Sequence, residues 1–305
     1  MIVVVCPGQG SQTPGFLDPW VAEPQFRDHL GSLSDAASLD LLAHGTVSDA
    51  DTIRDTAVAQ PLIVAAGLLT LRALLDGRRG GIAGVAGHSV GELTAAAAAG
   101  ILSEHDAMTV VRERGAAMAD AAAQAQTGMS AVIGADEDEL LAKLSALDLE
   151  PANFNGGGQI VVAGDVAALE QFKQDPPAGA RVIPLQVAGA FHTRYMATAV
   201  ERLRAATATV ESHDPSLTIW TNYDGSAVDN GSRFVDLLVG QVSSPVRWDK
   251  TMESLATAGV TGIIEVAPAG ALVGLAKRGL KGVPTVAVKT PDDLDAAIAL
   301  IDGNS

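Results

Sequence analysis

The run Gly87-His88-Ser89-Val90-Gly91 has the residue types and spacing of a reactive serine site. A serine with glycine two residues before and after it is typical of a nucleophile on a sharp strand-to-helix turn, where a Cβ would obstruct the backbone. The apolar segment 81–87 predicts the strand, and 90–100 predicts a helix whose amino terminus points at Ser89. Free N–H groups at a helix start favour developing negative charge. The motif alone leaves open whether water or another acceptor receives an acyl group from Ser89.

A serine nucleophile needs a general base, and the sequence offers six histidines. His88 adjoins Ser89, so we expect its side chain to point to the opposite side of the turn. His192 follows an apolar strand in QVAGAFHTRYM, at a strand-to-loop transition that commonly presents catalytic groups. We therefore favour His192 as the base. The remaining four lie in polar contexts that predict solvated side chains: His29, His44, His105 and His213.

A glycine-containing loop, CPGQGSQ at 6–12, follows the first apolar run of the chain. Its glycines allow the backbone to approach a bound group closely, and one of its N–H groups could contribute to an oxyanion hole. A flexible turn without chemistry is the alternative. A phosphate-binding loop is disfavoured because the Lys-Ser/Thr ending is absent.

Arg114 is the most informative charged residue. It falls within the apolar stripe of a helix predicted to start at Ser103, a stripe formed by Ala107, Val110, Val111, Ala117 and Met118. A guanidinium on that stripe faces the protein and needs an anionic partner. Two alternatives remain open: a structural ion pair with a local carboxylate, or a bidentate clamp for a substrate carboxylate. Arg112 lies off the stripe, which predicts a solvated side chain.

Strand and helix signals alternate along the chain and predict an α/β fold with a largely parallel sheet. The middle of the chain differs, because strand and helix signals there follow the order βαββαβ of a ferredoxin-like unit. We therefore expect a catalytic subdomain formed by residues 1–124 and 192–305. Residues 125–191 are predicted to form the inserted ferredoxin-like subdomain.

Composition excludes several classes of function. The chain has 305 residues, a net charge of −16 and only 4% aromatic residues, which argues against nucleic-acid binding. Its single cysteine, Cys6, cannot form an internal disulfide. The apolar run that contains Cys6 lacks a basic leader and is too short for a signal peptide or a membrane span, so we expect a cytoplasmic protein with no membrane contact.

Taken together, the motifs resemble those of the malonyl-coenzyme A:acyl carrier protein transacylases of type II fatty-acid synthesis and of the related acyltransferase domains of polyketide synthases. The resemblance covers nearly the whole chain. The motifs are PGQGSQ (7–12), AQPL (59–62), GHSVGE (87–92), RERGAAM (112–118), GMSAVIG (128–134), NFNGGGQIVVAG (153–164), GAFHTRYM (189–196), QVSSPVRW (241–248) and IEVAPAGALVGL (264–275). Two stretches depart from the family pattern: EVAPAG, where a GPG-like sequence is more usual, and the glycine-rich NGGGQ.

The resemblance implies a fold and a set of roles. The fold is an α/β-hydrolase-like core with a ferredoxin-like subdomain. Ser89 is similar to the acylated nucleophile and His192 to its base, while Arg114 matches the arginine that pairs with the free carboxylate of malonate. The remaining implied roles are backbone oxyanion donors at Gln9 and Val90, a histidine-orienting main-chain carbonyl at Gln241, and malonyl selectivity from Phe191 and Val90.

The implied reaction is ping-pong transfer of malonyl from coenzyme A to the phosphopantetheine thiol of acyl carrier protein. It needs no cofactor and no metal, and we expect a monomer. One alternative is a stand-alone acyltransferase of a polyketide pathway, which neighbouring genes would distinguish. A serine esterase or thioesterase is disfavoured because a neutral acyl chain leaves Arg114 without a partner. A non-catalytic carrier-binding module is disfavoured by the presence of both Ser89 and His192.

Overall fold

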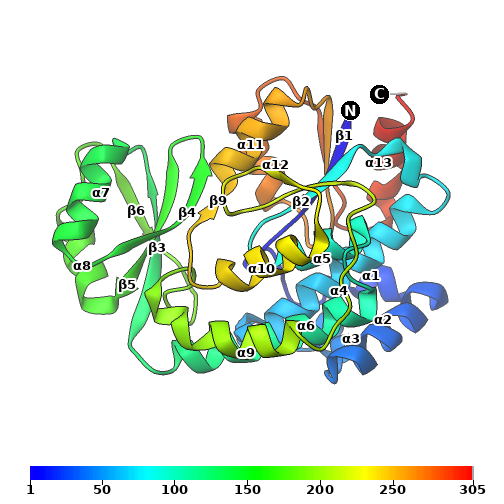
Figure 1. The fold of residues 1–305 in the computed structure, drawn as a ribbon, viewed down its shortest axis with the longest axis horizontal. Helices are drawn as coiled ribbons and strands as arrows, with labels where there is room; N and C mark the ends of the chain where they lie inside the picture. The colour runs from blue at the N-terminus through cyan, green and yellow to red at the C-terminus, as the bar shows by residue number, and fades with distance from the viewer. Residues whose placement is uncertain (304–305) are drawn as a thin grey trace.

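The computed structural model describes residues 1–303 and contains two β-sheets (Figure 1). The first sheet has six strands in the order β11-β10-β1-β2-β7-β8. All of its pairings are parallel except that between β7 and β8. Its strands are β1 (Ile2–Cys6), β2 (Gly84–Gly87), β7 (Thr218–Trp220), β8 (Ala227–Val228), β10 (Gly262–Glu265) and β11 (Thr285–Ala287). The mixed α/β fold predicted from the alternating pattern is confirmed.

The two central strands of the first sheet determine where the serine motif lies. β1 and β2 are buried along their whole length, which explains their continuous apolar sequences. They pair in parallel with Cys6 opposite Gly87. The loop after β1 and the turn after β2 therefore leave the sheet side by side. In this way the register places segment 7–9 next to His88 and Ser89.

Helices cover both faces of the first sheet. The longest is α4 (Thr56–Leu75), which packs along α6 (Glu104–Ala122). α4 is long and apolar enough to cross a bilayer, but 78% of the relevant window is buried inside the protein. The others are α1 (Asp18–Val21), α2 (Pro24–Ala37), α3 (Leu41–Thr46), α5 (Gly91–Ala99), α9 (Ala197–Thr207), α10 (Gly231–Gln241), α11 (Trp248–Thr257), α12 (Ala271–Gly279) and α13 (Leu294–Ile301). Short 3₁₀ turns are η1 (Thr52–Arg54), η2 (Arg79–Gly81), η3 (Arg194–Met196) and η4 (Pro291–Asp293).

The second sheet has five strands in the order β6-β3-β5-β4-β9, with α7 and α8 on its outer side (Figure 1). Its elements are β3 (Thr127–Ile133), α7 (Glu137–Ala146), β4 (Glu150–Gly156), β5 (Gln159–Asp165), α8 (Val166–Gln174), β6 (Arg181–Pro184) and β9 (Val246–Arg247). The first six follow one another as βαββαβ, and a separate apolar cluster around Phe172 packs α7 and α8 on the sheet. The added strand β9 lies outside 125–191 and pairs with β4. The proposed division at 125 and 191 stays a prediction.

Candidate active site

Ser89 lies on the sharp turn between β2 and α5 and has a left-handed backbone, with φ of 53°. Such a conformation is strained for a residue other than glycine and is found where the surroundings fix it. A Cβ at Gly87 would lie 2.1 Å from the carbonyl carbon of Gly91, and one at Gly91 would lie 2.1 Å from the carbonyl oxygen of Cys6. Both glycines are therefore required by the close approach of β1, β2 and α5.

The structure places His192 against Ser89. The two side chains meet at 2.7 Å between Ser89 Oγ and His192 Nε2. On the other side of the ring, His192 Nδ1 lies 2.8 Å from the main-chain oxygen of Gln241. A carbonyl can only accept, so Nδ1 carries the proton and Nε2 is left to accept the proton of Ser89. This is the geometry of a serine nucleophile with a general base.

Burial keeps His192 uncharged. Loss of solvent and, secondarily, the positive charge of Arg114 lower the pKa of His192 to about 3, against the opposing hydrogen bond to the Gln241 carbonyl. A neutral imidazole is the form that can remove a proton from Ser89. His192 itself has a φ of 62°. Both members of the pair therefore occupy strained backbone positions, which is common at functional sites.

An asparagine that the sequence analysis did not identify holds the serine turn in place. Asn222 Oδ1 accepts from the Ser89 amide at 2.7 Å, and Asn222 Nδ2 donates to the Gly87 carbonyl at 2.6 Å. Asn222 follows β7, the neighbour of β2, and is fully buried. The available signal was its place directly after an apolar strand, which becomes informative only when the strand order is known.

The predicted oxyanion donors Gln9 and Val90 lie at the same cavity as Ser89. Within residues 1–303, neither backbone amide donates a hydrogen bond to another protein group. Val90 is the residue before the first turn of α5, where helix N–H groups lack partners inside the helix. Both amides are thus free to donate to a bound oxygen. Their role as an oxyanion hole stays a prediction.

Arg114 is completely buried and reaches the serine. One of its Nη atoms donates to Gln60 Oε1 at 2.6 Å, and the other donates to Gln241 Oε1 at 2.7 Å and lies 3.3 Å from Ser89 Oγ. Its Nε has no partner among the described residues, and no carboxylate of residues 1–303 lies within ion-pair distance. The structural ion pair considered above is therefore not present. The side-chain amides of Gln60 and Gln241 are partners of Arg114 that sequence reasoning missed, although Gln241 was expected at His192 through its main-chain carbonyl.

Glu92 supplies a second buried charge behind the serine. Its carboxylate accepts from the backbone N–H of Asn222 at 2.6 Å and from the side-chain amide of Gln241. Burial raises the pKa of Glu92 to about 7, although these hydrogen bonds and Arg114 oppose the shift. Burial likewise lowers the pKa of Arg114 to about 10, with Glu92 acting in the opposite direction. Gln241 thus bridges the two charges and also holds His192 through its main chain.

The other histidines are not part of this arrangement. His88 Nε2 pairs with Asn155 Oδ1 at 2.9 Å and makes no hydrogen bond to Ser89, although its ring lines the same cavity. The expectation of a solvated His29 is wrong. His29 is only 5% exposed and pairs with Glu104 at 2.7 Å, because α2 packs its inner face on α6.

A cavity of about 400 Å³ leads to Ser89 between the two sheets. Ser89, His192 and Gln60 line it, together with six residues of the second sheet. Phe191 and Val90, the predicted selectivity residues, both line it, and Arg278 of α12 is the one Lys or Arg that the described part of the chain contributes to the lining. Side chains from the second sheet are Met129, Ala131, Asn153, Asn155, Gln159 and Val161. The cavity therefore offers a mainly apolar passage to a polar, buried end.

Comparison with known proteins gives a consistent result. The acyl transferase domain family matches residues 3–292. A Mycobacterium tuberculosis (strain H37Rv) protein named malonyl CoA-acyl carrier protein transacylase is 51% identical over 299 residues, which is 97% of this chain and 98% of the relative. The crystal structure of MCAT from Mycobacterium tuberculosis matches with a TM-score of 0.95 at 50% identity, covering 98% and 99% of the two chains.

A further structural relative is a malonyl-transacylase in complex with a type II polyketide synthase acyl-carrier protein. It matches with a TM-score of 0.93 at 29% identity, covering 98% of this chain and 99% of that one. The family match extends over both sheets and includes the turn at Ser89, the loop 185–193 that carries His192 (the histidine loop) and helix α6 with Arg114. On this evidence the chain belongs to the acyl transferase domain family.

Proposed function

We propose that this protein is a malonyl-CoA:acyl carrier protein transacylase. The observation that carries the proposal is a buried guanidinium, that of Arg114, 3.3 Å from the hydroxyl of Ser89. Its hydrogen-bond partners Gln60 and Gln241 are neutral amides, so its positive charge is not cancelled by a contacting carboxylate. An acyl group with a free terminal carboxylate satisfies that charge when its carbonyl carbon is at Ser89.

The first half-reaction forms an acyl-enzyme. His192 Nε2 takes the proton of Ser89 while Oγ attacks the thioester carbonyl of malonyl-CoA. The tetrahedral oxygen accepts from the Gln9 and Val90 amides, which donate to no other group of residues 1–303. Collapse breaks the carbon–sulfur bond, and the proton on His192 passes to the departing thiolate of coenzyme A. Malonyl-Ser89 remains, with its carboxylate on Arg114.

The second half-reaction reverses these steps with a different thiol. The phosphopantetheine thiol of acyl carrier protein gives its proton to His192 and attacks the ester carbonyl of malonyl-Ser89. Breaking the carbon–oxygen bond returns the proton to Ser89 Oγ and releases the malonyl thioester. Each atom and proton is accounted for by Ser89, His192 and the two thiols, so the proposed route requires no cofactor.

Two features of the cavity support a preference for malonyl. Phe191 lies next to the base, and Val90 next to the nucleophile, and both line the cavity. Phe191 is only 6% exposed, so its ring is held by its surroundings. A methyl group on the α-carbon of the acyl chain would have to share that space. We infer that these two side chains disfavour branched donors.

The carrier protein would approach from the open end of the cavity, where Arg278 lies. Lys277 and Lys281 are exposed beside it, and carrier proteins are usually acidic. The relatives named above support acyl carrier protein as the acceptor, and the polyketide complex keeps a polyketide carrier as the second candidate. We also propose a cytoplasmic location, on the grounds of the single buried cysteine and the buried α4.

Intact-mass measurement tests the proposal directly. The protein is incubated separately with malonyl-, methylmalonyl- and acetyl-CoA, and then with a phosphopantetheinylated carrier protein. We expect a malonyl adduct that Ser89→Ala abolishes and that disappears as the carrier protein gains the same mass. Rapid loss of the adduct to water, with no gain on the carrier protein, would support the esterase alternative instead.

A further inference from the structure

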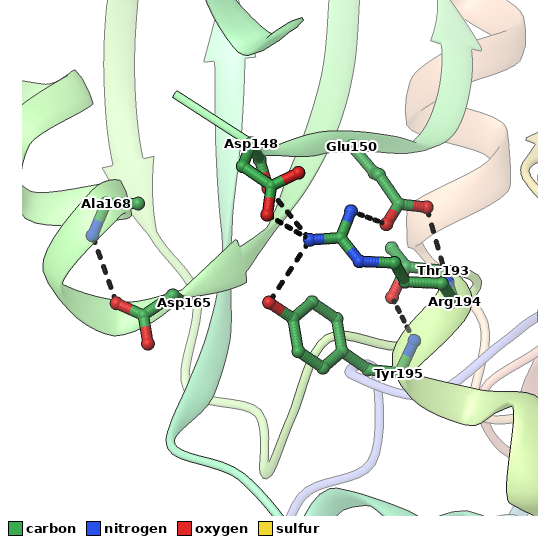
Figure 2. A network of polar contacts seen from close by, with 7 residues as sticks. All are labelled: Asp148, Glu150, Asp165, Ala168, Thr193, Arg194 and Tyr195. Atoms are coloured by element: carbon green, nitrogen blue, oxygen red, sulfur yellow. Dashed lines mark hydrogen bonds and ion pairs between the residues drawn. The ribbon is translucent and has the colours of Figure 1, made fainter. Parts of the chain in front are cut away.

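Arg194 lies two residues after His192, at the start of the 3₁₀ turn η3. It does not line the cavity, and its side chain is directed toward Asp148 and Glu150. Figure 2 shows the guanidinium held between Asp148 and Glu150, with the ring of Tyr195 beside it. The resemblance that identified Ser89, His192 and Arg114 gives this arginine no role. Nothing in the proposed reaction touches it.

The contacts of Arg194 are numerous for an exposed residue. Its Nη2 lies 2.6 Å from Asp148 Oδ2 and 3.3 Å from the Asp148 main-chain oxygen, and its Nη1 donates to Glu150 Oε1. Its own backbone amide donates to Glu150 Oε2 at 3.2 Å. The guanidinium also lies 4.9 Å from the centre of the Tyr195 ring. Glu150 therefore binds both the side chain and the main chain of one residue.

These contacts join two parts of the structure. Glu150 is the first residue of β4 in the second sheet, and Asp148 lies just before it. His192, by contrast, faces Ser89, which the first sheet positions. The cavity runs between the two sheets. Arg194 thus fastens the histidine loop to the sheet on the far side of the substrate passage.

The histidine loop needs such fastening because the backbone of His192 is strained. With a φ of 62°, it keeps its conformation only where several contacts fix it. The His192 amide donates to the Val242 carbonyl at 3.1 Å, and the Ala190 amide donates to Thr127 Oγ1 at 3.0 Å. Those anchors lie at or before His192 in the chain. After His192, the Thr193 hydroxyl donates to the Ala190 carbonyl at 2.6 Å within the same loop. The Arg194 contacts join this side of the loop to the second sheet.

We propose that Arg194, clamped by Asp148 and Glu150, is a positioning residue that holds the His192 imidazole at hydrogen-bond distance from Ser89. The inference rests on the proposed roles of Ser89 and His192 as nucleophile and base. It assigns Asp148 and Glu150 a part in the reaction although both lie outside the cavity lining. It also makes the second sheet a support for the base as well as a wall of the passage.

The expected effect is on rate and not on stability. Exposed ion pairs contribute little to the free energy of folding, so loss of the clamp leaves the melting temperature almost unchanged. Displacement of a catalytic group by about 1 Å reduces rate by about 10²-fold. A partly released loop, still held by Val242 and Thr127, gives a smaller loss, and we expect about a tenfold reduction.

Arg202 provides a matched control. Its side chain is 43% exposed, against 45% for Arg194, and it also binds two carboxylates, those of Glu113 and Asp120. Its contacts join α9 to α6 and do not involve the histidine loop. Arg202→Ala therefore removes an equivalent set of surface ion pairs without affecting His192.

The experiment measures the reactivity of Ser89 toward a small fluorophosphonate, which needs the nucleophile and its base but no malonyl group. The maximal inactivation rate and the half-saturating concentration are determined for the full-length wild type, Arg194→Ala, Arg194→Lys and Arg202→Ala, and intact mass confirms one adduct. We expect Arg194→Ala to lower the maximal rate about tenfold with unchanged half-saturation. Arg194→Lys should recover part of the rate, and Arg202→Ala should match wild type.

Equal maximal rates for Arg194→Ala and Arg202→Ala would overturn the proposal. A loss of rate that is matched across the variants by a fall in melting temperature would also overturn it. If Arg194→Ala does not fold, Asp148→Asn combined with Glu150→Gln removes the same clamp from its acceptor side. If the wild type does not transfer malonyl but Arg194→Ala still slows the reaction with the fluorophosphonate, the proposed function alone is refuted. If the wild type transfers malonyl and Arg194→Ala reacts with the fluorophosphonate at the wild-type rate, the clamp alone is refuted.

Discussion

Replacement of Arg114 by alanine is the sharpest test of how the site selects its acyl group. The side chain is fully buried and donates to the side-chain oxygens of Gln60 and Gln241. Within residues 1–303, Arg114→Ala removes the one cation that contacts the Ser89 hydroxyl. It leaves the Ser89–His192 hydrogen bond and the Gln241 main-chain carbonyl in place. An acetyl donor, which carries no carboxylate, loses no direct interaction.

The magnitude follows from the fork geometry of the guanidinium. A hydrogen bond to a charged group contributes about 1.5–3 kcal/mol, so a bidentate pair contributes about 3–6 kcal/mol. At about 1.4 kcal/mol per factor of ten, the lower figure corresponds to about a 10²-fold change in selectivity. We use the lower figure because the substrate carboxylate competes with the hydrogen bonds that Arg114 already makes to Gln60 and Gln241, which reduces the net gain. We therefore expect the malonyl-to-acetyl ratio of kcat/KM to fall about 10²-fold.

Single-turnover acylation with malonyl-CoA and acetyl-CoA gives this ratio for each variant. The ratio is the required quantity, because loosening of Gln241 would slow both donors equally. Arg112→Ala is the matched control: it lies on the same helix, is partly exposed, and contacts Ser38 and Glu113 away from the cavity. An unchanged ratio in Arg114→Ala, even with low activity, would refute the clamp and make Arg114 structural.

Three further predictions concern the base, the turn and the cavity wall. Burial lowers the pKa of His192 to about 3, so the imidazole is neutral above that value and should add no inflection to the acylation rate from about pH 5 to 8. Because the pKa of Glu92 is raised to about 7, the profile is also measured in Glu92→Gln, and a rate that falls below pH 6.5 in both proteins would contradict this. A Cβ at Gly91 would lie 2.1 Å from the Cys6 carbonyl oxygen, so Gly91→Ala should lower the melting temperature by several degrees. The control is Gly240→Ala, where a Cβ meets no atom of residues 1–303 within 4 Å. Equal melting temperatures would count against the required glycine. Phe191→Ala should raise the methylmalonyl-to-malonyl ratio in the same acylation assay, and an unchanged ratio would remove Phe191 from the selectivity wall.

The sequence was sufficient to predict the proposed nucleophile, its base and the main-chain carbonyl of Gln241 beside that base, but not the other side chains that hold them in place. Ser89 was predictable because glycines on both sides of a serine, between a strand and a helix, are what a nucleophile on a tight turn requires. His192 was predictable because it follows an apolar segment at the start of a loop, and the structure places it 2.7 Å from Ser89. Arg114 was predictable as a buried cation from helical periodicity. Each of these signals is local, involving neighbours within a turn or a strand.

The supporting amides and the carboxylate were not predictable in the same way. Asn222 contacts Ser89 from 133 positions away, and Gln60 contacts Arg114 from 54 positions away. No periodicity joins such pairs, because only the strand order and the packing of α4 on α6 bring them together. Glu92 had a weak local signal, a carboxylate in the first turn of an otherwise apolar helix. The error at His29 has the same origin, because helix packing and not local polarity determined its burial.

The arrangement of charges behind Ser89 explains why the enzyme would favour a donor that is itself an anion. Arg114 and Glu92 are both buried, yet Gln241 lies between them and hydrogen-bonds to each. Had they been in contact, the guanidinium would be neutralised and a malonyl carboxylate would gain little there. Burial lowers the pKa of Arg114 only to about 10, so it stays charged at neutral pH, while burial raises that of Glu92 to about 7. A positive charge kept apart from its nearest counter-charge is stabilised most by the carboxylate that arrives with the substrate, and an acetyl group brings none.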